Sequence, residues 1–233
     1  MSHITLKNVC KAYRMGSNAI QALNNLSLDI EQGEFVVILG PSGSGKTTFL
    51  NILGGLERAD SGEIVVGGES VNQMSEDTLT AYRRRSVGFV FQFFNLLPTL
   101  TALENVALTA EMVKDGYNPQ AMLERVKLGD RAEHYPGQLS GGQQQRVAIA
   151  RSLAKKPALV LADEPTGSLD IETGIDVLEV MHDLNRETGQ TIVLVTHNSA
   201  IAQIADRVVH ISNGAVHKVA TNPNPLAPRE LSW

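Results

Sequence analysis

The sequence predicts an α/β protein whose core is a parallel β-sheet. Strand patterns alternate along the chain with helical patterns, as in "EFVVILG" followed by "KTTFLNILGGL". Two more continuous apolar runs, "ALVLADE" and "TIVLVTH", bracket the helical stretch "TGIDVLEVMHDLNRETG". Such runs suit strands that are covered on both faces. A glycine-rich loop separates the first strand from its helix, so the parallel core begins with the order strand, loop, helix.

Composition limits the function classes that remain open. The chain has 233 residues, of which 42% are hydrophobic and 19% charged, so it can bury a core as one large domain or as a core with an inserted lobe. A formal net charge of -5 argues against a dedicated nucleic-acid binder. Cys10 is the only cysteine, which excludes an intrachain disulfide and fits a reducing cytosol. Apolar runs are far shorter than the roughly 20 residues of a membrane-spanning helix, and the N-terminus lacks a signal-peptide core, so we expect any membrane role to come through a partner.

The N-terminal region is predicted to form antiparallel strands. Ile4 and Leu6 alternate with polar residues, and so do Leu26, Leu28 and Ile30. A period of two is typical of strands that are buried on one face. These strands are expected to pair with each other in a sheet beside the parallel core.

A region of helical composition extends from about residue 93 to residue 156. Thr101 and Glu104 form a capping-box pattern, and Asn118 followed by Pro119 is typical of the start of a short helix. We expect this region to form a helical lobe inserted into the sheet domain. Farther along the chain, Gly189 stands where a helix C-cap is expected.

The end of the chain is expected to contain a hairpin and a loose tail. "VVHISNGAVHKV" predicts a hairpin that turns at Asn213 and Gly214. The segment "TNPNPLAPRELSW", residues 221–233, contains three prolines and shows no periodicity, so it is expected to be extended or disordered. Trp233 at its end is an alternative anchor for a partner.

The loop "GPSGSGKTT" carries the first chemical motif. Gly40, Gly45, Lys46 and Thr47 satisfy G-x-x-x-x-G-K-[ST], the P-loop pattern. Glycines let successive backbone N–H groups turn toward phosphate oxygens, the helix that follows adds the positive end of its dipole, and Lys46 adds a full charge. The Thr47 hydroxyl can ligate Mg²⁺. A glycine-rich turn that binds no nucleotide is the simpler alternative. The other residues expected to bind nucleotide in this loop are Pro41, Ser42, Gly43, Ser44 and Thr48.

A metal-bound nucleotide also needs an acidic residue, and "ALVLADEP" provides two. Asp163 ends a buried strand at the edge where α/β sheets bind ligands, so it is the candidate Mg²⁺ ligand. Adjacent side chains of an extended strand point in opposite directions, which would let Glu164 reach a water beside the γ-phosphate as general base. Taken alone, such a pair is more often a solvated strand end.

A second glycine-containing helix start follows in "LSGGQQQRVAIARSLA". Ser140 is a good N-cap, and Val147, Ala150 and Ala154 form an apolar stripe at helical spacing. A helix N-terminus can bind phosphate. In isolation, however, Ser-Gly-Gly is usually a turn and cap with no ligand, and the chain already contains one phosphate loop.

The combined order of these motifs resembles the ATP-binding subunit of ABC transporters. GPSGSGKT, a glutamine after "VGFVF", LSGGQ, LVLADE, SLD and a histidine in "LVTHN" occur in the family's order, and the resemblance covers about residues 2 to 220. It implies a P-loop NTPase of the ABC ATPase fold. That fold has a RecA-like parallel core, about 1–92 and 157–220, an N-terminal antiparallel β subdomain and a helical subdomain, about 93–156. The ATP-binding domain would then span 1–220.

The resemblance also implies roles for single residues. Tyr13 matches the aromatic residue that stacks on adenine, although a lone tyrosine after a strand more often packs. Gln92 matches the glutamine that contacts Mg²⁺ and the attacking water, although an ordinary loop amide is the alternative. His197 matches the histidine that contacts the γ-phosphate, and Lys46 and Glu164 complete the catalytic set. Asp170, in "SLD", matches the loop that joins two active sites.

In the family, the LSGGQ helix faces nucleotide held by another subunit. Ser140, Gly141, Gly142 and Gln143 would therefore bind ATP on the P-loop of a second copy, and transition-state charge would be stabilised from both sides. The resemblance thus implies a homodimer around two ATP molecules, with Mg²⁺ as the metal.

The resemblance further implies an integral membrane permease as partner, with the chain on the cytoplasmic side of the inner membrane. "FQFFNLLPTLTALENV" is the matching docking region, and internal packing of its apolar residues is the alternative. "DEPTGSLD" is most similar to the lipoprotein-release and macrolide-exporter branch (LolD-like and MacB-like), although Ser168 stands where many of its members have asparagine. A cell-division ABC complex that transports nothing is a second hypothesis, and a non-transport ABC ATPase a third. The sequence identifies neither the permease nor the transported substrate.

Overall fold

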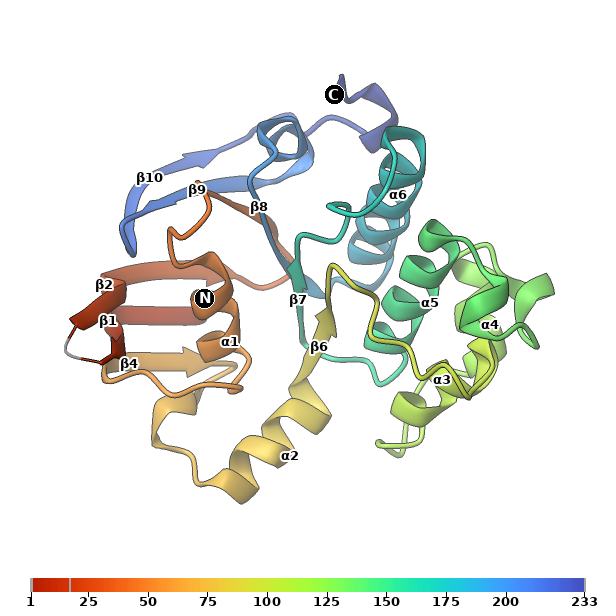
Figure 1. Cartoon of the computed structure of the whole chain (residues 1–233), viewed down its shortest axis with the longest axis horizontal. Helices are drawn as coiled ribbons and strands as arrows, with labels where there is room; N and C mark the ends of the chain where they lie inside the picture. The colour runs from red at the N-terminus through yellow and green to blue at the C-terminus, as the bar shows by residue number, and fades with distance from the viewer. Residues whose placement is uncertain (1, 17, 233) are drawn as a thin grey trace.

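A computed structural model describes residues 2–16 and 18–232, which form two β-sheets with helices around them (Figure 1). The smaller sheet is antiparallel and has the strand order β2-β1-β4-β5. It confirms the antiparallel region predicted from the alternation near the N-terminus. Its strands are β1 Ser2–Met15, β2 Asn18–Glu31, β4 Ser61–Val66 and β5 Glu69–Ser70.

The larger sheet has the strand order β10-β9-β3-β8-β7-β6 and forms the core. Its strands from β9 to β6 are parallel, and β10 pairs with β9 as an antiparallel hairpin. The parallel core and the hairpin at Asn213 and Gly214 are therefore confirmed. The strands are β3 Phe35–Leu39, β6 Val87–Val90, β7 Leu159–Asp163, β8 Thr191–Thr196, β9 Arg207–Ser212 and β10 Ala215–Thr221.

The helices divide between the two sides of the core (Figure 1). α3, α4 and α5 gather on one side as the inserted helical lobe, whereas α1 lies beside the antiparallel sheet. The α-helices are α1 Lys46–Leu53, α2 Glu76–Ser86, α3 Ala102–Ala110, α4 Pro119–Arg125, α5 Gly141–Leu153 and α6 Ile171–Thr188. Short 3₁₀ helices occur at Val71–Gln73, Gly129–Arg131, Pro136–Gln138, Ser199–Ile204 and Pro228–Glu230.

Strand β3 is buried on both faces and separates two hydrophobic clusters. Phe35, Val37 and Leu39 belong to the cluster shared with the helical lobe and α6. Val36 and Ile38 belong to the cluster shared with α1 and the antiparallel sheet. The continuous apolar run of this strand thus has a physical cause, because alternate side chains enter different cores.

The predicted caps form as hydrogen bonds. Thr101 and Glu104 form a reciprocal capping box at the start of α3, with bonds of 3.2 and 2.7 Å. Asn118 accepts a bond from the Ala121 amide at the start of α4. Gly189 ends α6 with φ 65, a left-handed conformation that glycine adopts at little cost.

Helix α2 is an element for which the sequence analysis made no prediction. Ser75 caps it by accepting a hydrogen bond from the Thr78 amide. Along the helix only Leu79 and Tyr82 are buried, so the hydrophobic pattern is sparse. A helix with so narrow an apolar stripe gives little periodic signal.

The tail, expected to be extended or disordered over residues 221–233, is in contact with α6 where the structure describes it. Leu231 is buried, and the Arg229 guanidinium contacts Asp176 at 2.6 Å and Glu179 at 3.0 Å, both on α6. Ion pairs between distant segments leave no periodicity in the sequence, so these contacts of the tail with α6 could not be predicted from it. Trp233 lies outside the described residues. None of the helices within the described residues combines the length and the hydrophobicity that a membrane span requires.

Candidate nucleotide-binding site

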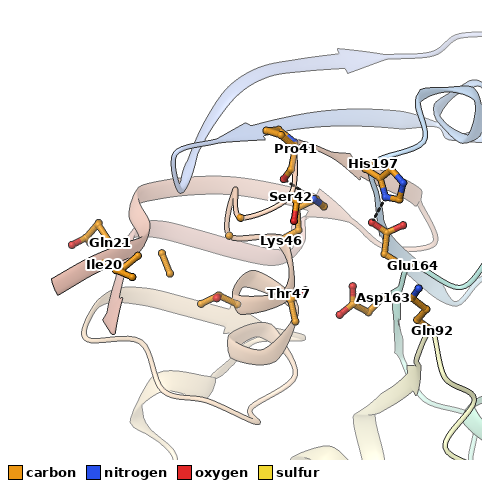
Figure 2. Close-up of a pocket in the computed structure, with 14 residues that line it drawn as sticks. Ile20, Gln21, Pro41, Ser42, Lys46, Thr47, Gln92, Asp163, Glu164 and His197 are labelled. Atoms are coloured by element: carbon orange, nitrogen blue, oxygen red, sulfur yellow. Dashed lines mark hydrogen bonds and ion pairs between the residues drawn. The ribbon is translucent and has the colours of Figure 1, made fainter. Parts of the chain in front are cut away.

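A cavity of about 740 Å³ opens at the carboxyl ends of β3, β7 and β8 (Figure 2). It brings together most of the residues predicted for nucleotide binding and catalysis. The cavity also contains Ile20, Gln21 and Ala22 of β2, which the sequence analysis missed. Its lining comprises Ile20, Gln21, Ala22, Pro41, Ser42, Gly43, Gly45, Lys46, Thr47, Thr48, Gln92, Asp163, Glu164 and His197.

The phosphate loop connects β3 to α1 and is closely packed against its neighbours. A Cβ atom at Gly40 would lie 2.3 Å from the Ile211 carbonyl oxygen, and one at Gly45 would lie 2.3 Å from the Ala22 carbonyl oxygen. Gly45 also has φ 99. The Gly214 amide in the turn of the β9–β10 hairpin donates to the Ser44 carbonyl at 3.1 Å. The glycines are thus required by close backbone approach and by conformation.

The N-terminus of α1 fits an anionic ligand. Gly45 is its N-cap, and no side chain caps the first amides. Lys46 is only 8% exposed, and its Nζ donates to the Gly40 and Pro41 carbonyls at 2.8 and 3.0 Å. Free helical amides beside a buried ammonium are the groups that bind phosphate oxygens. The residues present therefore fit a nucleoside triphosphate.

Asp163 and Thr47 line the same part of the cavity. Burial raises the pKa of the Asp163 carboxyl; a hydrogen bond from Thr47 and the charge of Lys46 oppose this rise, and the charge of Glu164 adds to it. An ionised carboxylate in this position is therefore costly until a cation arrives. Carboxylate, hydroxyl and amide oxygens from Asp163, Thr47 and Gln92 are a suitable donor set for Mg²⁺.

Removing the negative charge of Asp163 is expected to stabilise the folded protein when neither metal nor nucleotide is bound. The pKa of Asp163 is higher in the folded than in the unfolded protein, so ionisation of its carboxyl opposes folding. This destabilisation is absent at low pH and grows as the pH rises through the raised pKa. We expect Asp163→Asn to raise the Tm at pH 7 by about 1–3 °C and to abolish Mg²⁺-dependent ATP turnover. Thermal unfolding with and without Mg²⁺-ATP measures both effects. A lower Tm in the apo protein would contradict the expectation.

Glu164 adopts a left-handed conformation with φ 46. The sequence analysis treated it as an extended residue whose side chain points away from that of Asp163; instead, both side chains line the cavity. The Glu164 carboxylate lies 2.8 Å from His197 Nδ1 (Figure 2). It also accepts a 3.1 Å bond from the Thr196 hydroxyl. Left-handed backbone costs about 1–2 kcal/mol in a residue other than glycine, and such strain is common at active sites.

Gln92 follows β6 and lies at the side of the cavity nearest the helical lobe. Its backbone carbonyl accepts a 3.1 Å hydrogen bond from the Ser168 hydroxyl. Its side-chain nitrogen Nε2 would lie 3.0 Å from a Cβ atom placed on Gly167. Gln92 is therefore in contact with the segment that follows Glu164, so the lobe and the acidic strand end are directly linked.

The LSGGQ residues do not line this cavity. Ser140 and Gln143 form a capping box at the start of α5, with bonds of 3.3 and 2.9 Å. A Cβ atom at Gly142 would lie 1.9 Å from Thr173 Cγ2, so this helix start is packed closely against α6. Asp170 caps α6 through the Thr173 amide at 3.0 Å, and this bond lowers the pKa of its carboxyl. Ser140, Gly141, Gly142, Gln143 and Asp170 are thus absent from the residues that line the cavity within one chain.

Tyr13 does not line the cavity itself but adjoins it. It pairs across the sheet with the cavity residue Ile20, and its hydroxyl lies 3.3 Å from the Thr48 hydroxyl. Its side chain is 37% exposed. Strand pairing thus explains why β2 contributes to the site. The sequence predicts that these strands pair, but no local motif signals the register that brings Ile20 beside Tyr13.

A parallel sheet with a strand, a glycine loop and a helix-borne lysine, together with a strand-end aspartate, defines the class of P-loop nucleoside triphosphatases. A family model described as "ABC transporter" matches residues 23–167. The chain therefore belongs to the ABC transporter family, as an ATP-hydrolysing ATP-binding subunit in the branch of LolD-like and MacB-like proteins. This membership confirms the predicted fold and enzyme class.

Curated relatives agree with this assignment. The chain is 48% identical over 224 residues to an uncharacterized ABC transporter ATP-binding protein, MJ0796, of Methanocaldococcus jannaschii, covering 92% of this chain and 95% of the relative. It is 44% identical over 218 residues to the macrolide export ATP-binding/permease protein MacB of Brucella melitensis. That match covers 91% of this chain but 34% of MacB.

Solved structures show the same fold. The cassette MJ0796, in a dimeric post-hydrolysis state bound to ADP and Pi, superposes with a TM-score of 0.86 at 44% identity, covering 94% of this chain and 98% of that chain. A second dimeric structure of MJ0796 gives a TM-score of 0.85 at 46% identity, with the same coverage of both chains.

Proposed function

We propose that two copies of this chain close around two Mg²⁺-ATP molecules and drive a separate membrane permease. The observation that carries the proposal is the separation of the two predicted phosphate sites: Lys46 lines the cavity, whereas Ser140 stands at the start of another helix outside the cavity lining. If each LSGGQ helix binds nucleotide, a second copy must supply it. The dimeric structures of MJ0796 support this arrangement.

The cavity residues that carry the sequence motifs have proposed parts in nucleotide binding and hydrolysis. Lys46 and the loop amides bind the phosphates, and Thr47, Asp163 and Gln92 hold Mg²⁺, which supplies charge neutralisation when bound. Glu164 accepts the proton of the attacking water, and His197 contacts the γ-phosphate. The loop that begins with Gly40 and ends with Thr48 binds nucleotide, as do Tyr13, the LSGGQ residues and Asp170 from their separate positions.

A surface on the helical lobe is the proposed docking site for the permease. Of the apolar residues in "FQFFNLLPTL", Phe93 is 72% and Leu97 46% exposed, whereas Leu96 packs against the core. The structure thus divides this stretch between exposed and packed side chains. Leu108 and Tyr135 add exposed apolar side chains to the same lobe. Apolar exposure of this kind is typical of protein contact sites.

Co-purification tests the permease. We expect an integral membrane protein to co-purify with this chain from solubilised membranes, and Leu97→Asp to lose that association while the isolated chain keeps its ATPase rate. Val219→Asp places the same charge on an exposed apolar residue of β10 and serves as the matched control. Association that survives Leu97→Asp, or is lost equally in both variants, would contradict the proposed surface.

A further inference from the structure

Tyr13 is held by a carboxylate that the nucleotide site does not otherwise use. Its hydroxyl donates a short hydrogen bond to Glu57 and lies 3.3 Å from the Thr48 hydroxyl. Glu57 stands beyond the end of α1 and does not line the cavity. It matches none of the motifs that predict phosphate or metal binding.

The other oxygen of the Glu57 carboxylate is tied to the phosphate-loop helix. It accepts a 2.7 Å bond from Asn51 Nδ2, and Asn51 lies in α1. The Asn51 carbonyl in turn accepts the Glu57 amide at 3.2 Å and the Leu56 amide at 2.8 Å. Side chain and backbone of Glu57 are therefore both fixed to the helix that begins at Lys46.

The Tyr13 ring is fixed by further contacts. The Lys11 ammonium lies 5.7 Å from the ring centroid and pairs with Asp60 at 3.2 Å. Asp60 also accepts the Ala12 amide at 2.7 Å, which ties β1 to the segment after α1. Burial and, after it, the hydrogen bond to Glu57 raise the pKa of Tyr13, so its hydroxyl stays protonated as a donor.

The ring also stands at one end of the cavity. Cross-strand partners project on the same face of a sheet, and Tyr13 pairs with Ile20, which lines the cavity. Ile20 is 52% exposed and Tyr13 37% exposed, so an apolar and an aromatic surface lie side by side, open to a ligand. An aromatic base extending from phosphates on α1 would be stacked by this pair.

We propose that Glu57 is a positioning residue for the nucleotide base, because it fixes the Tyr13 ring to the helix that binds the phosphates. The inference rests on the proposed role of Tyr13 as a base-stacking residue. Triphosphate and base would then be recognised by groups anchored on one helix, with Asn51 and Glu57 setting the distance between them. The ligand class is a nucleoside triphosphate whose base can stack on Tyr13. A phosphate chain without a base would not contact Tyr13, so its binding does not depend on Glu57.

The test compares ATP with inorganic tripolyphosphate, which lacks a base. We expect Glu57→Ala to raise the KM for ATP about threefold to tenfold, part of the loss seen when base stacking is removed. The kcat should stay within about twofold of the parent value, and the inhibition constant of tripolyphosphate should not change. Glu57→Gln keeps an acceptor for the Tyr13 hydroxyl and should restore most of the affinity for ATP.

Two more variants complete the experiment. Tyr13→Phe keeps the ring but loses the hydroxyl, and combining it with Glu57→Ala should add little to either single change, because both remove the same bond. Glu76→Ala removes an exposed carboxylate at the start of α2 that pairs with Arg58, and it should leave the KM for ATP unchanged.

The outcomes separate this inference from the proposed function. An unchanged KM for ATP in Glu57→Ala, or equal weakening of ATP and tripolyphosphate, would overturn the positioning role, since equal weakening indicates a general distortion of α1. If Tyr13→Ala weakens ATP binding but Glu57→Ala does not, the role of Tyr13 in base stacking is retained and only the role of Glu57 is refuted. If Tyr13→Ala has no effect, the stacking role itself fails, and the inference fails with it.

Discussion

Glu164→Gln is expected to lower the kcat for ATP hydrolysis by at least about 100-fold, the usual effect of losing a general base. An amide has nearly the shape of a carboxylate but cannot accept a proton at neutral pH. The amide can still hydrogen-bond to the Thr196 hydroxyl and His197, so the local geometry should persist. The Kd for ATP should change little, because Lys46 and the loop amides are untouched.

Steady-state ATPase rates and equilibrium ATP binding measure the two effects separately. Size-exclusion chromatography with ATP should show a longer-lived dimer, since hydrolysis no longer opens it. Glu63→Gln, at an exposed position of strand β4, makes the same chemical change away from the cavity and should leave turnover unaltered. Retained turnover in Glu164→Gln would exclude this residue as the base.

Two inactive variants are expected to restore activity when they are mixed. Lys46→Ala removes the phosphate anchor, and Ser140→Arg blocks the LSGGQ helix start, so neither homodimer contains an intact site. In a mixed dimer, one site combines the intact Lys46 of one chain with the intact Ser140 of the other. Random exchange should restore about a quarter of the wild-type rate, because half of the dimers are mixed and each has one intact site.

A chain carrying both substitutions provides the control. Mixed with wild-type chain, it forms dimers in which each of the two sites contains one damaged half, so wild-type activity should fall as the double variant is added in excess. If each site lies within a single chain, the double variant would leave wild-type activity unaffected. If the two sites must hydrolyse ATP together, the mixture of Lys46→Ala and Ser140→Arg stays inactive even though the sites are shared. The loss of wild-type activity caused by the double variant still shows shared sites in that case.

Much of the fold could be predicted because its determinants are local. The apolar run of β3 and the helix caps at Thr101, Asn118 and Ser140 depend on residues a few positions apart, and the structure confirms them. The phosphate loop could be placed for the same reason. Its glycines and Lys46 occupy fixed positions between a strand and a helix.

Other features depend on contacts that local patterns do not encode. Ile20 joins the cavity through the pairing of β2 with β1, and Arg229 anchors the tail on α6 across about fifty positions of sequence. The left-handed backbone of Glu164 is held by a hydrogen bond from its backbone amide to the Val195 carbonyl on the neighbouring strand. Each of these features appears only when distant segments meet.

The packing of the phosphate loop has a consequence for the thermodynamics of nucleotide binding. Gly40 and Gly45 fit against the carbonyls of Ile211 and Ala22, and the Gly214 amide donates to the Ser44 carbonyl, so two segments far from the loop in sequence, β2 and the β9–β10 hairpin, fix it before any ligand arrives. The loss of conformational entropy that ordering this loop requires therefore belongs to folding and not to association. A nucleotide meets a preorganised anion receptor, and a substitution at Gly214 would weaken binding without touching the nucleotide.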